Sequence, residues 1–125
     1  MKPQRSATFW ISFKYAGEGL LHAVRTQRNF RFHLLTAVVV VVLGLWLGLS
    51  LESWAVLTLT IGIVLVTEMI NTAAEAMVDL ASPDYHPLAK LVKDVAAGAV
   101  LLVALTSVVV GLLVLGTTLW TALGF

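Results

Sequence analysis

One stretch of the sequence carries polar side chains at helical spacing inside a run that is otherwise apolar. These side chains are Glu68, Asn71, Glu75 and Asp79. At roughly 100° per residue, all four fall along one face of a helix. Placing a carboxylate beside lipid is costly, so this face must meet protein, water or a metal ion, and such residues are functional by default. The alternative is a row of carboxylates that pair with Arg and Lys of neighbouring helices.

The elements that position this face are membrane spans. The chain has 125 residues, of which 59% are hydrophobic and 12% are charged, and a soluble domain of this size could not bury so much apolar surface. The long apolar runs predict an all-α membrane protein. We expect a single membrane-embedded domain over 1–125, with a surface helix at 6–27 and transmembrane helices at 30–49, 53–81 and 87–117.

The segment before the first span has the pattern of an amphipathic helix. Phe9, Trp10, Phe13 and Leu20 recur at helical spacing, while charged residues fill the other side. We expect this helix to lie in the membrane interface. A soluble helix packed against a partner is the alternative.

Small residues occur at spacings that are typical of helix contacts in lipid. Gly44 and Gly48 form a GxxxG pattern in the first span, and Ala97, Ala104 and Gly111 recur every seven residues in the third. Small side chains let helix backbones approach closely. The pattern favours association of spans and gives no number of subunits.

The basic residues predict the orientation of the chain. All eight lie before the first span or after the second, on one side of the bilayer, and this side is expected to be cytoplasmic: Lys2, Arg5, Lys14, Arg25, Arg28, Arg31, Lys90 and Lys93. The net charge is only +1, and there is no basic run with interleaved aromatic residues, so no nucleic-acid partner is expected. Cysteine is absent, which excludes disulfides and thiolate metal sites.

The depth of Glu68 bears on the kind of chemistry. Counted from Ser53, it lies about 22 Å along its span, which leaves about 8 Å to the cytoplasmic edge of a core about 30 Å thick. Transporters tend to place their key carboxylate near the midplane. A shallow carboxylate suits chemistry on a lipid headgroup with a water-soluble co-substrate. Glu75 lies about 10 Å further along the helix, so the two acids cannot both ligate one metal ion.

The connection between the second and third spans adds further polar side chains. It contains Asp84, Tyr85 and His86, and Lys90, Lys93 and Asp94 follow at the start of the third span. Lysines beside carboxylates at a membrane surface could bind phosphates that carry a metal ion. The alternative is ordinary anchoring by basic residues, with Lys90 and Asp94 as an i,i+4 pair. No phosphate-binding loop, HExxH or GxSxG motif occurs.

Residues 68–79 (EMINTAAEAMVD), the Tyr85-His86 pair and residues 89–100 (AKLVKDVAAGAV) together resemble the prokaryotic diacylglycerol kinase family. Residues 12–16 (SFKYA) and 28–33 (RNFRFH) are similar to its Gram-positive-type branch, whose members are commonly undecaprenol kinases. The resemblance implies a homotrimer with shared active sites in the cell inner membrane, with the sites at the cytoplasmic face. It also implies transfer of the γ-phosphoryl group of ATP, with Mg²⁺ as cofactor, to a lipid alcohol.

The resemblance also implies roles for individual residues. Glu68 would be the general base, Asn71 would orient that region, and Glu75 would hold Mg²⁺ on the ATP phosphates. The other residues matched to nucleotide binding are Tyr15, Asp84, Tyr85, His86, Lys93 and Asp94. A second metal-ligating glutamate of the family aligns with Gln27 here, and a neutral amide is a weaker Mg²⁺ ligand. For an early arginine that touches ATP in the family, Arg5 is the nearest candidate.

These observations lead to one expected function and its alternatives. We expect an ATP-dependent lipid kinase that acts on undecaprenol, with diacylglycerol as the alternative acceptor. A small oligomeric transporter or proton relay that uses Glu68 is an alternative of another class. A structural subunit whose acidic face only meets neighbouring lysines is a third.

Overall fold

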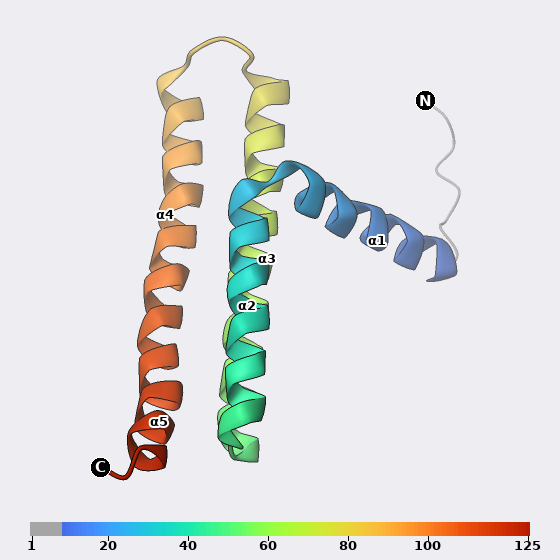
Figure 1. The fold of residues 1–125 in the computed structure, drawn as a ribbon. Coiled ribbons are helices and arrows are strands. Elements are labelled where there is room, and N and C mark those ends of the chain that lie inside the picture. Colours follow the sequence, from blue (N-terminus) through green and yellow to red (C-terminus); the bar gives the residue numbers. More distant parts are fainter. Residues whose placement is uncertain (1–8) are drawn as a thin grey trace.

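The computed structural model describes residues 9–125, and within this range the chain is helical without strands (Figure 1). Its elements are α1 (Phe9–Thr26), α2 (Arg28–Leu47), α3 (Leu51–Ala81), α4 (Pro87–Gly111), the π-helix η1 (Leu112–Gly116) and α5 (Thr117–Ala122). The predicted all-α class is confirmed. Lys2, Arg5 and positions 6–8 of the predicted surface helix lie outside the described residues.

In the described part of the chain, three helices are long and apolar enough to cross a membrane. They are α2, α3 and a continuous helix from Pro87 to Ala122. The last runs five residues past the predicted end at 117. It passes through the π-turn η1, after which the Thr117 and Thr118 hydroxyls donate to the carbonyls of Leu113 and Val114. Such bonds satisfy threonine hydroxyls inside an apolar helix.

A tight turn joins α2 to α3, and its residue types explain both helix ends. Gly48 has φ +67°, a left-handed conformation that glycine adopts without strain, so α2 ends at Leu47. The Ser50 hydroxyl accepts a hydrogen bond from the backbone N–H of Ser53 at 3.2 Å and caps α3. Gly44 lies against the indole of Trp54, where a Cβ atom would come within 2.7 Å of the ring. The GxxxG pattern thus serves a turn within one chain.

Helices α3 and α4 form a long hairpin whose connection lies at the opposite end of the molecule (Figure 1). Pro87 is the first residue of α4, and the His86 Nδ1 atom accepts from the backbone N–H of Leu88 at 3.1 Å. With 31 residues, α3 is about 46 Å long, whereas the 20 residues of α2 span about 30 Å. The length of α2 matches the thickness of a bilayer core. The α3–α4 hairpin is longer and extends past the start of α2.

Helix α1 leaves the start of α2 at a steep angle and points away from α4 (Figure 1). The guanidinium of Arg31 donates to the carbonyls of Val24 and Arg25 at 3.2 and 3.0 Å, and thereby satisfies the C-terminal end of α1. Phe9, Trp10 and Phe13 are exposed on this helix, which fits the predicted amphipathic surface helix.

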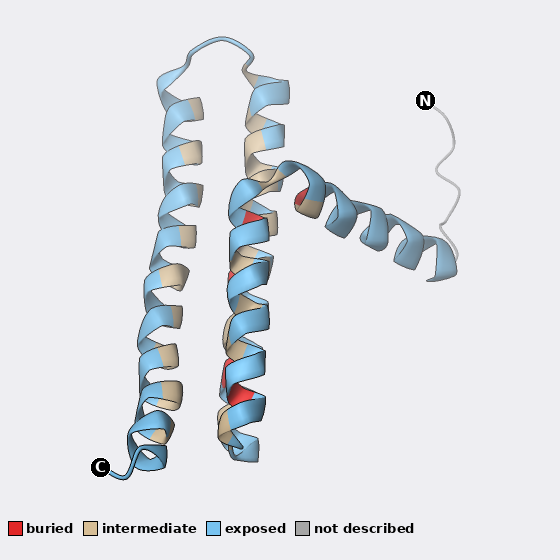
Figure 2. Cartoon of the chain, viewed as in Figure 1, coloured by how far each residue is buried: buried red, intermediate tan, exposed pale blue. Residues whose placement is uncertain are grey.

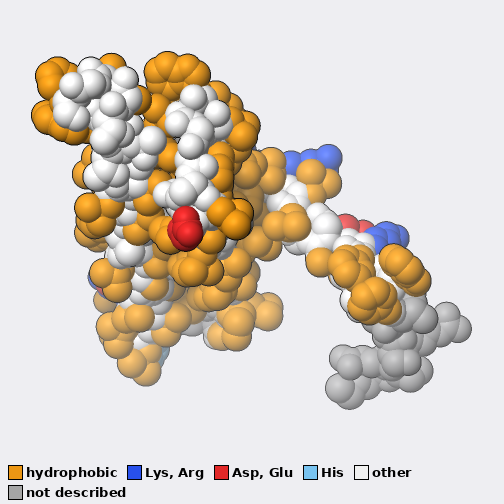
Figure 3. Space-filling view, turned by 90° about the horizontal axis from the view of Figure 1, so that it is seen from below, with side chains coloured by type: hydrophobic (Ala, Val, Ile, Leu, Met, Phe, Trp, Pro, Cys, Tyr) orange, Lys and Arg blue, Asp and Glu red, His pale blue; other side chains and the backbone are white. Residues whose placement is uncertain are grey.

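Few side chains are buried within a single chain (Figure 2). Among the described residues, the buried apolar side chains are Ala23, Phe30, Leu57 and Val64, and the one buried charged side chain is Glu68. At the end of the molecule that carries the α2–α3 turn, hydrophobic side chains cover much of the surface, with other side chains, backbone and an acidic group among them (Figure 3). Most apolar side chains therefore face lipid or other molecules.

Candidate active site

Glu68 is held at the contact between α3 and α2. Its side chain is 3% exposed, and its Oε1 atom lies 3.2 Å from the Nε2 atom of His33 on α2. In the part of the chain that the structure describes, no hydrogen bond reaches this oxygen. A buried carboxylate oxygen without a hydrogen bond is costly unless a donor arrives. The atom therefore has the properties of an acceptor for an incoming hydroxyl group.

Asn71 and Glu75 form the next pair along the same helix. The Asn71 amide donates to Oε1 of Glu75 at 3.2 Å, while its own Oδ1 is buried and receives no hydrogen bond from residues 9–125. Glu68 and Glu75 are two turns apart, or about 10 Å. His33 is five residues inside α2, so Glu75 stands slightly beyond the start of that helix. The Glu68 carboxylate therefore lies beside an imidazole in the contact between α2 and α3, whereas the Glu75 carboxylate accepts from an amide of its own helix.

The lysines at the start of α4 pair with two different acids. The Lys93 ammonium lies 2.6 Å from a carboxylate oxygen of Asp79, across the hairpin. Lys90 pairs instead with Asp94, the i,i+4 contact weighed from the sequence. Lys93 and Asp94 are thus neighbours in sequence with separate partners. Asp79, which the sequence placed on the acidic face without a role, is the residue that fixes Lys93.

A pocket between the ends of α3 and α4 collects most of the residues that the resemblance linked to nucleotide. The residues that line it include Asp79, Asp84, Tyr85, His86, Lys90, Lys93 and Asp94. Three of its chemical groups are already engaged, since His86 caps α4 and the two lysines hold carboxylates. The pocket thus combines basic, acidic and aromatic side chains between the ends of α3 and α4.

Glu75 does not line this pocket, and two of the other predicted nucleotide residues lie elsewhere in this chain. Tyr15 is 59% exposed on α1, and α1 points away from α4. Gln27 precedes α2, and its amide donates to the Thr26 hydroxyl at 3.3 Å. Neither residue lines the pocket between α3 and α4. One chain therefore does not bring the complete predicted set together.

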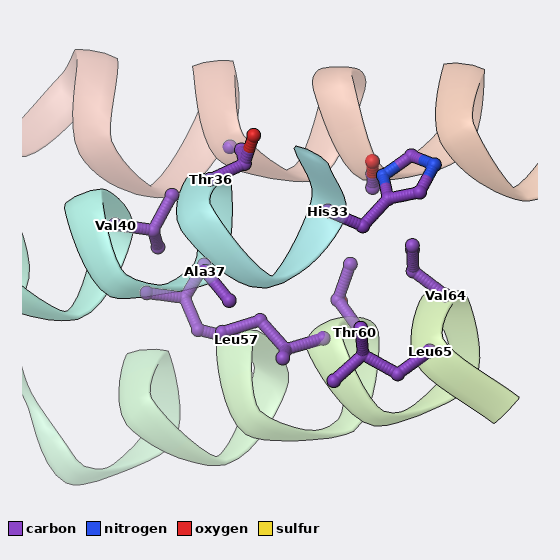
Figure 4. Close-up of a pocket in the computed structure, with 11 residues that line it drawn as sticks. His33, Thr36, Ala37, Val40, Leu57, Thr60, Val64 and Leu65 are labelled. Carbon is purple, nitrogen blue, oxygen red and sulfur yellow. The ribbon is translucent and has the colours of Figure 1, made fainter. Parts of the chain in front are cut away.

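A small apolar groove with a volume of about 70 Å³ runs from His33 along α2 and α3 toward the opposite end of the molecule. His33 and Val64 lie near one end of it, and Val40 and Leu57 lie toward the other (Figure 4). Its three hydroxyl side chains donate to carbonyls of their own helices, so the groove wall is apolar in effect: Thr36, Thr60 and Ser107. The groove offers an apolar surface of the kind that a hydrocarbon chain could contact.

The acidic residues do not form a metal cage by themselves. Within residues 9–125, no cluster of three or more His, Cys, Asp and Glu side chains could hold a metal ion. Mg²⁺ in kinases is usually held by one or two carboxylates together with substrate phosphates and water. Glu75, which accepts a hydrogen bond from the Asn71 amide, fits the part of such a single carboxylate. The residues present therefore fit a Mg²⁺ ion that arrives with phosphates.

The contact of His33 with Glu68 was not foreseen from the sequence. In the sequence, His33 is an ionisable residue at the edge of the first predicted span. A depth comparison could have found it, because His33 lies within about one turn of the cytoplasmic edge and Glu68 lies about 8 Å below that edge. Two ionisable groups in the same layer of a bilayer core are expected to pair.

Comparison with known proteins identifies the family. The family described as prokaryotic diacylglycerol kinase matches residues 14–115. The chain is 44% identical to the undecaprenol kinase of Bacillus subtilis (strain 168) over 106 residues, which cover 85% of this chain and 86% of that protein. It is 49% identical to the diacylglycerol kinase of Synechocystis over 102 residues, which cover 81% of this chain but only 58% of that protein.

A more distant relative shares the same region. The chain is 30% identical to the diacylglycerol kinase of Escherichia coli (strain K12) over 95 residues, which cover 76% of this chain and 78% of that protein. The family match spans most of the chain, and three apolar helices accompany it. This multi-pass membrane protein is therefore a lipid kinase and belongs to the prokaryotic diacylglycerol kinase family.

Proposed function

We propose that the protein transfers the γ-phosphoryl group of MgATP to the hydroxyl group of undecaprenol. The observation that carries this proposal is the buried Glu68 oxygen without a hydrogen bond, beside the end of an apolar groove. A lipid alcohol whose chain lies in the groove would bring its hydroxyl group to this oxygen. Diacylglycerol is the alternative acceptor.

The reaction follows from the positions of two carboxylates. Glu68 takes the proton of the lipid hydroxyl group, whose oxygen forms a bond to the γ-phosphorus. The bond between that phosphorus and its bridging oxygen to the β-phosphorus breaks, and ADP leaves. Most of the catalytic effect in phosphoryl transfer comes from positioning and charge stabilisation, so the chain needs few reactive groups.

The nucleotide side of the reaction lies at the bilayer surface. Glu75 would hold Mg²⁺, which neutralises negative charge on the phosphates, while Asn71 orients Glu75. Lys93, fixed by Asp79, would contact a phosphate, and Asp84, Tyr85 and His86 would surround the nucleotide. Asp94 belongs to the same pocket, and Tyr15 and Gln27 would come from a neighbouring chain.

The groove favours a polyprenol over a diacylglycerol. A diacylglycerol carries two ester carbonyl groups, which need hydrogen-bond donors when they leave water. The hydroxyl hydrogens of Thr36, Thr60 and Ser107 are already donated to helix carbonyls. A polyprenol carries no such acceptors along its chain. The relative from Bacillus subtilis, matched over 86% of its length, is named undecaprenol kinase, which agrees with this choice.

The assembly and its orientation are part of the proposal. Three copies would form the enzyme in the inner membrane, with the N-terminus and the active sites at the cytoplasmic face. Two features support this orientation. The pocket with Lys90 and Lys93 lies at the end of the molecule to which α1 with its Lys14 and Arg25 is attached, and basic residues mark the cytoplasmic side.

The test is a phosphorylation assay with purified protein, MgATP and either lipid alcohol. We expect phosphorylated undecaprenol from the wild type and a lower rate with diacylglycerol. Glu68→Gln should lower turnover by about 10²-fold or more, since a general base contributes about 10² to 10⁴ in rate. Its matched control is Glu52→Gln at the other end of α3, which should keep wild-type turnover. The absence of either phosphorylated lipid with the wild-type protein would contradict the proposal.

A further inference from the structure

We propose that His33 is a positioning residue that sets the direction of the Glu68 carboxylate during phosphoryl transfer. The inference rests on the proposed role of Glu68 as the base. It starts from one contact between two helices, in which Nε2 of His33 lies 3.2 Å from Oε1 of Glu68. The two side chains are 16% and 3% exposed, so water takes little part in the contact.

No other cationic group reaches Glu68 in the described part of the chain. Among residues 9–125, Lys93 pairs with Asp79 on α3, Lys90 pairs with Asp94 on α4, and Arg31 bonds to the carbonyls at the end of α1. The three ion pairs found in this range include Glu68 only with His33. A buried carboxylate near lipid needs a polar partner, and His33 is the one that this chain provides.

An imidazole is a better partner for a general base than a lysine or an arginine side chain. A permanent cation would stabilise the ionised carboxylate and so weaken its tendency to take a proton. A neutral imidazole donates one N–H group, which can fix the direction of the carboxylate without fixing its charge. Position 33 therefore holds a donor that leaves the base free to act.

The His33–Glu68 contact is close but is not aligned as a hydrogen bond, as is common in active sites that hold no substrate. The ring N–H group does not point along the line to Oε1, since no hydrogen bond reaches that oxygen. Catalytic hydrogen bonds are often poorly aligned without substrate and tighten in the reacting complex. A small rotation of the His33 ring would complete the bond. The ring also lines the apolar groove, so a lipid chain there would press on the group that aligns the base.

The test compares two variants that differ in reach. In His33→Gln, the longer side chain places an amide N–H group where Nε2 lies, whereas in His33→Asn the amide is too short to reach Glu68. Both are uncharged and polar, so they disturb the fold to a similar degree. His22→Gln is the control, because His22 is exposed on α1. The measurements are kcat, the KM for MgATP and the melting temperature of each purified variant.

We expect His33→Asn to lower kcat at least about tenfold with an unchanged KM for MgATP, and His33→Gln to stay within about threefold of the wild type. Equal kcat values for the two variants, or a change in KM alone, would overturn the inference. Equal melting temperatures are expected, and a kcat loss that follows a lower melting temperature would mean a structural role. If Glu68→Gln is inactive while His33→Asn is not impaired, the base assignment stands and this inference fails.

Discussion

Four acids along α3 and α4 have different partners, and the partners separate their chemical roles. Glu68 is buried and lies beside the imidazole of His33, Glu75 accepts from an amide, Asp79 holds Lys93, and Asp94 holds Lys90. A carboxylate that is already neutralised by a lysine is poorly available as a base or as a metal ligand. Of these four acids, Glu68 and Glu75 have no lysine partner and are therefore the ones that remain for chemistry.

Glu75→Gln separates metal binding from proton transfer. We expect the KM for MgATP to rise by about tenfold, because a neutral amide is a weaker ligand for Mg²⁺ than a carboxylate. A higher concentration of free Mg²⁺ should restore part of the rate. Initial rates at varied MgATP and varied free Mg²⁺ check this, with Glu52→Gln as the control. An unchanged KM at all Mg²⁺ concentrations would remove Glu75 from the metal site.

The partners of individual acidic side chains could not be predicted from the sequence. The acidic face was predictable, because Glu68, Asn71 and Glu75 share one side of a helix at fixed spacing. The partner of each acid was not, because the partner depends on how far α2 and α4 are shifted along α3. Asp79 could pair with Lys90 or Lys93 by sequence alone, and the hairpin geometry selects Lys93.

At the scale of elements, the spans were predictable from hydropathy, and their ends were set by local chemistry. The first span was predicted at 30–49, whereas α2 covers Arg28–Leu47. Gly48 in a left-handed conformation stops the helix, and Ser50 starts the next one. The GxxxG pattern was interpreted as a contact between spans, and Gly44 does meet Trp54 of α3, but Gly48 serves as a cap. Hydropathy alone does not distinguish these two uses of glycine.

Gly44→Ala tests the packing of α2 on α3. The added Cβ atom would come within 2.7 Å of the Trp54 ring and 2.9 Å of Leu49, and overpacking of this kind costs about 1–3 kcal/mol. We expect a lower melting temperature. Gly17→Ala is the matched control, because nothing lies within 4 Å of its new Cβ atom and alanine favours a helix. Equal melting temperatures for the two variants would show that the turn has room for the methyl group.

At the scale of the whole molecule, one chain does not bring all residues of the proposed site together. Only four apolar side chains are buried among residues 9–125, and Tyr15 lies on a helix that points away from the nucleotide pocket. A second copy, turned about an axis through the bilayer, can bring its own α1 to the pocket of the first. Closed cyclic symmetry then gives every copy the same environment. The sequence predicted this assembly only through the family resemblance, because the spacing of small residues fixes no subunit number.

The outer face of α3 is the surface where these copies are expected to meet. Thr58, Gly62 and Thr67 lie there beside a shallow hollow that no other helix of the described chain covers, and nothing lies within 4 Å of a Cβ atom at Gly62. Small and hydroxyl side chains are the usual contacts between helices in lipid. A large side chain at this position would therefore separate the chains without a clash inside one chain.

Gly62→Leu should lower the mass of the purified protein from that of a trimer toward that of one chain, with loss of kinase activity and retention of helix content. Light scattering that subtracts the detergent measures the mass, and circular dichroism measures the helices. Gly98→Leu is the matched control, because its Cβ atom would also meet nothing within 4 Å but lies on α4. If Gly62→Leu stays trimeric and active, α3 does not form the contact. If it becomes monomeric yet active, each chain holds a complete site, and Tyr15 is not needed at the pocket between α3 and α4.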